Sequence, residues 1–225
     1  MVFLYAELAP YITRCMEALA AEGVSVDVLA YPVNKEAPFK FDESENLVQY
    51  RNRFDLTNNE ILNYLIEKKP DAIICSGWID KGYIQAIKTY SAKTTRVLAL
   101  DNKLERGLKA RASALRAKAL YKSLFDYAWV PGPPQAEFAK SIGFDENEIW
   151  QKFYTADFEH FAKLDSNIER KEFPKRFIYV GRYVDFKGIN ELFSAFRKVE
   201  NNGWQLFCAG TGDLFDERPI EKNIH

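Results

Sequence analysis

Short apolar runs alternate with amphipathic stretches along most of the chain. The apolar runs have the length and residue types of buried strands, and apolar residues at i, i+3 and i+4 between them indicate helices. The strands are expected at 2–5, 24–30, 47–50, 72–75, 97–100, 127–130 and near 149–153. Repeated strand–helix units predict a parallel sheet covered by helices on both faces, an α/β, doubly wound, Rossmann-like domain.

Local signals fix several helix ends in this pattern. Gly23 ends the first helix, and Thr57 with Glu60 forms a capping-box pattern before the second. The residues 31–46 form a polar, proline-containing connection. The longest helix is expected over 103–125.

A second strand–loop–helix pattern occupies the sequence RFIYVGRYVDFKGINELFSAF, residues 176–196. The strand over 177–180 is followed by a tight basic loop and then by a helix with one apolar face. The loop contains Gly181, Arg182, Lys187 and Gly188. A further strand over 206–209 ends in the glycine-rich turn Gly210-Thr211-Gly212-Asp213.

This pattern has the chemistry of a phosphate site. A strand, a glycine turn and a helix together aim backbone N–H groups and a positive helix end at an anion. Arg182 and Lys187 add two cations beside the same loop, which suits a diphosphate. The alternative is an ordinary α/β crossover with basic residues on a solvated loop.

The pattern also divides the chain. We expect a first domain at 1–155, a linker rich in charge at 156–174 and a second domain at 175–225. Two strands and one helix are too few to bury a domain core. We therefore expect the chain to be a fragment, or an unusually short form, of a longer protein.

Composition narrows the possible partners. The 225 residues carry a formal net charge of −1, so no general attraction to nucleic acid or to anionic membranes is expected. The three cysteines are dispersed in apolar runs without metal spacing, which indicates reduced core residues of a cytoplasmic protein. No apolar run approaches the ~18 residues of a membrane span.

Polar residues follow the carboxyl ends of the strands in the first domain. In doubly wound sheets this is the edge where ligands bind. The candidates there are Glu7, Trp78, Asp80, Lys81, Asp101, Asn102 and Arg106. For Asp101 and Asn102 the alternative is local capping of the next helix. No carboxylate pair is clearly poised for a metal, and no metal site is expected.

These motifs together resemble the family-4 retaining glycosyltransferases, which have the two-Rossmann-domain GT-B fold. The matching residues of the second domain are Gly181, Arg182, Lys187, Gly188, Gly210 and Gly212. The run YAWVPGPPQAEFAKSIGFDENEIW at 127–150 resembles the same family in the first domain, and Asp157 with Phe161 matches its interdomain segment.

The resemblance implies transfer of a sugar from a nucleoside-diphosphate sugar to a glycan, a lipid or a small molecule, with retention of the anomeric configuration. It implies that Arg182 and Lys187 are catalytic cations, which stabilise the negative charge growing on the β-phosphate without a metal or another cofactor. Many relatives carry a histidine in the first domain, whereas the histidines here are His160 and His225. The family's paired glutamates would lie beyond His225, so we expect the chain by itself to be inactive.

The stretch 103–125 is strongly basic, with seven cations against Glu105. Leu104, Leu108, Leu115 and Ala119 form an apolar side. A basic amphipathic helix can rest on an anionic membrane, here the inner membrane surface, and would suit a lipid-linked acceptor. The alternative is a packed helix with a solvated basic face.

Two further functions remain as alternatives to the enzyme. One is a non-catalytic α/β module that binds a nucleotide or a phospho-sugar. The other is a dinucleotide oxidoreductase, which the sequence disfavours because Gly210-Thr211-Gly212 lacks a third glycine at the required offset.

Overall fold

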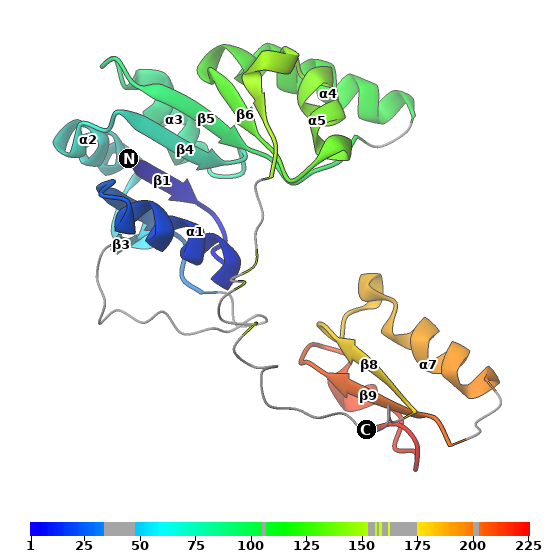
Figure 1. Ribbon diagram of the computed structural model, residues 1–225. Coiled ribbons are helices and arrows are strands. Elements are labelled where there is room, and N and C mark those ends of the chain that lie inside the picture. The colour runs from blue at the N-terminus through cyan, green and yellow to red at the C-terminus, as the bar shows by residue number, and fades with distance from the viewer. Residues whose placement is uncertain are drawn as a thin grey trace. The chain divides into compact units, whose positions relative to one another are not determined.

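The computed structural model describes residues 1–33, 48–104, 107–152, 175–199 and 203–225, together with 156, 158 and 162. The chain divides into two compact units (Figure 1). The first runs to Phe158, and the second contains the described residues from Lys175 onward. Most of the predicted linker at 156–174 lies outside the described residues, as do Asp157, His160 and Phe161.

The first unit is built on a parallel sheet of seven strands in the order β3-β2-β1-β4-β5-β6-β7. The strands are β1 (Val2–Tyr5), β2 (Val26–Ala30), β3 (Val48–Asn52), β4 (Ala72–Ser76), β5 (Thr95–Ala99), β6 (Tyr127–Trp129) and β7 (Ile149–Trp150). Every residue of β1 and β2 is buried, as expected for strands that are covered on both faces. The predicted α/β fold with a doubly wound parallel sheet is confirmed.

Helices cover both faces of this sheet (Figure 1). They are α1 (Pro10–Ala21), α2 (Asn58–Lys68), α3 (Lys81–Thr89), α4 (Leu108–Tyr121) and α5 (Pro133–Ser141). On one face Ile12 and Met16 of α1 pack against Phe3 and Val28. On the other face α2 to α5 contribute to a second apolar cluster.

The capping box predicted at the start of α2 is present. The Thr57 N–H donates to Glu60 Oε2 over 2.8 Å, and the Thr57 hydroxyl donates to the same oxygen over 2.7 Å. These hydrogen bonds lower the pKa of Glu60.

The helix predicted over 103–125 is wrong in its bounds. It begins at Leu108 and ends at Tyr121, followed by a single 3₁₀ turn at Lys122–Leu124. Gly107 precedes it with a φ of 113°, in the region that favours glycine and that a continuous helix cannot pass through.

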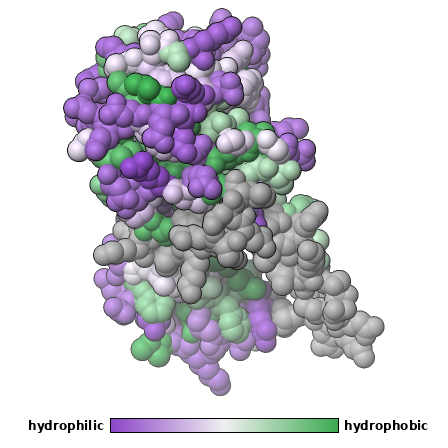
Figure 2. Space-filling model, turned by 90° about the vertical axis from the view of Figure 1, so that its left-hand side faces the viewer, coloured by the Kyte–Doolittle hydropathy of each residue, from purple (hydrophilic) through white to green (hydrophobic). Residues whose placement is uncertain are grey.

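The second unit pairs β8 (Arg176–Val180) with β9 (Gln205–Ala209) in parallel and adds α7 (Ile189–Lys198). Its core contains Tyr183, Ile189, Phe193, Phe196, Leu206 and Ile224. The last residues join the sheet, because the His225 N–H donates to Leu206 O over 2.9 Å. Figure 2 shows hydrophilic and hydrophobic residues on the visible surface of both units.

Within the described ranges, none of the helices combines the length and the apolar character that a bilayer crossing requires.

Candidate functional site

The sheet of the first unit reverses its winding between β1 and β4, and this is where doubly wound folds bind ligands. α1 packs on one face and α2 to α5 on the other, so the connections after β1 and β4 diverge. The Ala6 N–H donates to Ser76 Oγ over 2.9 Å and joins the two strand ends. The Gly77 N–H donates to Ala99 O over 3.0 Å and adds the end of β5.

Most of the predicted acceptor-side residues stand at this edge. Glu7, Asp101 and Asn102 are exposed in the segments that follow β1 and β5, and Lys81 is exposed at the first position of α3. The alternative in which Asp101 or Asn102 caps the next helix is wrong, because the N-cap of α4 is Gly107. Arg106 lies outside the described residues.

Trp78 is at the same edge, but its ring is packed. It stacks on Tyr121 of α4 with ring centroids 4.9 Å apart and an angle of 6° between the rings. Phe138 of α5 lies 6.3 Å away, and all three rings contact the buried core. Trp78 therefore packs against α4 and α5 and holds them at the end of β4.

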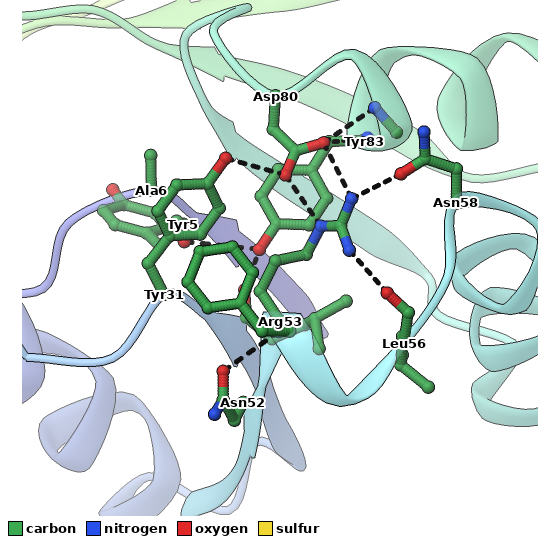
Figure 3. Close-up of polar contacts among 12 residues, drawn as sticks. Tyr5, Ala6, Tyr31, Asn52, Arg53, Leu56, Asn58, Asp80 and Tyr83 are labelled. Atoms are coloured by element: carbon green, nitrogen blue, oxygen red, sulfur yellow. Dashed lines mark hydrogen bonds and ion pairs between the residues drawn. The ribbon is translucent and has the colours of Figure 1, made fainter.

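Asp80 is buried, with 7% of its surface exposed, and both of its carboxylate oxygens are occupied (Figure 3). Oδ1 accepts from the N–H groups of Gly82 (2.7 Å) and Tyr83 (3.0 Å), which caps the start of α3. Oδ2 accepts from Arg53 Nε over 2.7 Å and from the Tyr31 hydroxyl over 3.0 Å. The prediction that Asp80 faces an acceptor is wrong, because its lone pairs are used by the protein itself.

Arg53, which follows β3, is equally buried and holds this cluster together. Its Nη1 donates to Leu56 O over 2.7 Å, and its Nη2 donates to Asn58 Oδ1 over 2.5 Å (Figure 3). Burial by itself would raise the pKa of Asp80, but hydrogen bonds from Arg53, Tyr83 and Tyr31 and the charge of Arg53 lower it below its usual value. The carboxylate is therefore held in its charged form.

In the second unit, Tyr183 fastens together the two glycine loops that follow β8 and β9. Its N–H donates to Thr211 O over 2.8 Å, and its carbonyl accepts from the Leu214 N–H over 3.0 Å. The Tyr183 side chain is buried in the core of the unit. The two loops predicted at the carboxyl ends of neighbouring parallel strands therefore do lie side by side.

This contact depends on glycine. A Cβ on Gly210 would lie 1.8 Å from Gly181 O, and a Cβ on Gly212 would lie 2.5 Å from Tyr183 O. Both glycines also have positive φ angles, of 157° and 145°. A side chain at either position would force the two loops apart.

Arg182 and Lys187 lie over one aromatic ring. The Arg182 guanidinium carbon and the Lys187 Nζ are each 5.5 Å from the centroid of Phe186, whose side chain is 73% exposed. The structure thus brings the two predicted cations together around a solvent-facing ring.

Beside these cations lies the N-cap of α7, Gly188, which has a left-handed conformation. No side chain among the described residues caps this helix, so the N–H groups of its first turn are left for another acceptor. The Gly181 N–H is different. It donates to Ala209 O over 3.0 Å as a continuation of the sheet, so it is not among the backbone N–H groups aimed at an anion.

The part of the chain that the structure describes contains no group of three or more His, Cys, Asp or Glu residues arranged to hold a metal ion.

Comparisons with known proteins show which other proteins share this fold. No protein-family model matches the chain, and a search of curated proteins finds no match. Among solved structures, the catalytic domain of starch synthase IV from Arabidopsis thaliana, bound to ADP and acarbose, matches with a TM-score of 0.60 and 10% identity. The match covers 94% of this chain and 68% of that chain.

An α/β-galactoside α-2,3-sialyltransferase from the luminous marine bacterium Photobacterium phosphoreum matches with a TM-score of 0.47 and 15% identity, over 94% of this chain and 74% of that chain. At 10% identity, the likeness to the starch synthase shows a shared fold, the GT-B type with Rossmann-like units that the sequence predicts.

Several residues of these clusters, among them Arg53, Tyr183 and Phe186, are not among the residues that the sequence predicts. Arg53 was overlooked because its partner Asp80 is remote in sequence. Tyr183 and Phe186 lie in the same loop as the predicted cations, and the aromatic residue directly before Lys187 is a usable signal.

Proposed function

We propose that the chain acts in retaining glycosyl transfer from a nucleoside-diphosphate sugar, with the diphosphate bound at the loops after β8 and β9. The observation that carries the proposal is the pair of cations, Arg182 and Lys187, over Phe186 at the start of an uncapped helix. The proposal also draws on the GT-B fold, which the chain shares with a starch synthase that binds ADP.

The electrostatics of this loop suit a diphosphate. Two cations near one ring provide a fixed positive charge, and the first turn of α7 adds N–H donors and the positive end of the helix dipole. Arg182 can bind phosphate oxygens with two parallel hydrogen bonds, and Lys187 acts as a point charge. These groups would do the work that a divalent metal does at other diphosphate sites.

The chemical role follows from where charge develops. As the bond between the sugar and the β-phosphate breaks, its electron pair stays on the phosphate oxygen. Arg182 and Lys187 then interact more strongly with the leaving diphosphate than with the intact donor, which lowers the barrier. Loss of one such contact costs about 3 kcal/mol of transition-state stabilisation.

For the acceptor we propose the exposed edge of the first unit. Glu7, Asp101 and Asn102 provide hydrogen-bonding groups at the ends of β1 and β5 for the hydroxyls of a sugar. Asp80 is a positioning residue for this edge, because it caps α3 and joins it to Arg53. A glycan, a lipid-linked sugar or a small molecule would each present such hydroxyls.

Donor binding tests the proposal directly. Calorimetric titration of the full chain with ADP, UDP and GDP should show binding of at least one diphosphate, tighter than that of the matching monophosphate. The Arg182→Ala and Lys187→Ala variants should each weaken this binding about 10- to 100-fold, which corresponds to the loss of a charged hydrogen bond.

The matched control is Arg176→Ala. Arg176 also lies over a ring, 5.1 Å from the centroid of Phe207, but at the amino end of β8. The Arg176→Ala variant should bind the diphosphate as the wild type does. Wild-type affinity in both loop variants, or equal losses in all three, would contradict the proposal.

The second candidate is a binding module without catalysis. The same loop supports it, but the module and the enzyme differ in what happens to a bound donor. Incubation with nucleoside-diphosphate sugars and a panel of acceptors should release the nucleoside diphosphate if the chain is catalytic. Release of the nucleoside diphosphate or transfer of the sugar favours the enzyme over the module.

A further inference from the structure

α4 packs on the protein by its small residues and presents its leucines to solvent. Ala114 and Ala117 are buried, whereas the side chains of Leu108 and Leu115 are 83% and 66% exposed. At 100° per residue, Leu108 and Leu115 fall on one line along the helix, with Ala117 on the opposite side and Ala114 turned about 100° from Leu115. The predicted alternative, a packed helix with a solvated basic face, agrees with the buried alanines and the exposed Lys109 and Arg116, but it does not account for the exposed leucines.

Leu104 and Leu120 are also exposed, but Leu120 lies on another side of the helix and Leu104 lies before it. Contiguous apolar surface such as the line of Leu108 and Leu115 usually marks a contact with another molecule or a membrane, because exposing it to water is unfavourable. In Figure 1, α4 lies at the periphery of the helical layer of the first unit.

Cations border the leucines on both sides. Lys109 and Arg116 lie along one edge of the line, and Arg111 and Lys118 lie along the other. α4 contains no Asp or Glu. Lys109, Arg111 and Arg116 make no ion pair within the described part of the chain.

We propose that this face of α4, the leucine–cation face formed by Leu108, Leu115, Lys109, Arg111 and Arg116, binds the surface of a bilayer that contains anionic lipids. A line of leucines between two rows of cations matches the interface of such a bilayer, where the apolar chains begin just below the phosphates. A purely electrostatic polyanion such as nucleic acid would use the cations and leave the leucines in water. With a net charge of −1 on the whole chain, the attraction is local to this face.

Vesicle sedimentation with the full chain tests this proposal independently of the donor site. The protein should bind vesicles of phosphatidylcholine with phosphatidylglycerol and should bind vesicles of phosphatidylcholine alone far more weakly. Raising the salt from about 0.1 M to about 1 M shortens the Debye length from ~10 Å to ~3 Å and should remove most of the difference.

Two double variants separate the contributions. Lys109→Gln with Arg116→Gln should lower the partition coefficient about 25-fold, which is about fivefold for each cation near an anionic surface. Leu108→Gln with Leu115→Gln should lower it about tenfold or more, because two apolar side chains no longer enter the interface. Glutamine keeps a high helix propensity, so thermal melting should not change.

The matched controls are Ile66→Gln on α2 and Lys88→Gln on α3, which alter an exposed apolar and an exposed basic residue elsewhere in the same unit. They should bind vesicles as the wild type does. Equal binding to neutral and anionic vesicles would overturn the proposal. So would wild-type binding by the leucine variant, which would show that the leucines do not enter the bilayer.

Discussion

The guanidinium of Arg53 and the carboxylate of Asp80 form a buried ion pair, with Nε 2.7 Å from Oδ2. The pair joins the segment after β3 to the first turn of α3, so it fixes the carboxyl edge of the sheet where ligands are expected. It is a structural element of the candidate site rather than a ligand contact.

Replacing Asp80 by Asn should destabilise the first unit by about 3–5 kcal/mol. The amide can still cap α3, but Arg53 is left buried without its counter-charge. Urea unfolding followed by circular dichroism measures the change. The matched control is Glu17→Gln, which breaks the exposed Arg14–Glu17 pair and should cost less than about 1 kcal/mol. Similar small losses in both variants would contradict the assigned role of the buried pair.

The same pair predicts an acid dependence of stability. Because the pKa of Asp80 is lowered in the folded protein, its contribution is complete above the unfolded value of about 3.9 and is lost as the pH falls through the lower folded value. Unfolding free energies measured from pH 7 down to acid should therefore fall more steeply for the wild type than for Asp80→Asn. Parallel curves would show that Asp80 does not carry this dependence.

Gly210→Ala should open the second unit locally. The new Cβ would meet Gly181 O and adopt an unfavourable φ, so we expect a loss of about 3 kcal/mol or more. Hydrogen exchange of the N–H groups in β8 and β9 measures it. Gly203→Ala is the control, because Gly203 also has a positive φ of 83° but no atom within 4 Å of its Cβ. It should show the backbone cost of about 1–2 kcal/mol alone.

Phe186→Ala should weaken diphosphate binding about three- to tenfold without changing stability. The exposed ring holds Arg182 and Lys187 by two cation–π contacts, each worth about 0.5–1 kcal/mol at such a site. Calorimetric titration provides the measurement. Phe54→Ala, at another exposed aromatic position, should bind as the wild type does. Unchanged affinity in Phe186→Ala would show that the ring does not position the cations.

The sequence predicts the strands and the capping box well because these depend on nearby residues. An apolar run such as Val97 to Leu100 is recognisable without knowledge of its partners, and Thr57 with Glu60 forms its contacts within one turn. The parallel order of the strands follows from the repeated crossovers.

The orientation of α4 could not be predicted in the same way. Its leucines carry the strongest hydrophobic signal, but the buried side is formed by Ala114 and Ala117, whose small side chains let the helix approach its neighbours. The helical period is correct, but it leaves open which side faces the protein. Only the packing of the whole unit decides between the two sides.

The sequence does not predict the pairing of Arg53 with Asp80, for a different reason. The two residues are 27 positions apart and belong to segments that follow strands not adjacent in the sheet. A carboxylate at a strand end has the same appearance in the sequence whether it meets a ligand or a buried arginine. Tertiary structure supplies the distinction.

Tyr183 has a consequence for ligand affinity. Because its N–H and its carbonyl both bond to the loop after β9, the loops that carry Arg182 and Gly210 are set in place when the protein folds. A diphosphate that binds there, as we propose, would meet a preorganised surface and would lose little conformational entropy on association. The affinity of this loop for a ligand should therefore depend on the number of phosphate charges and not on the cost of ordering the loops.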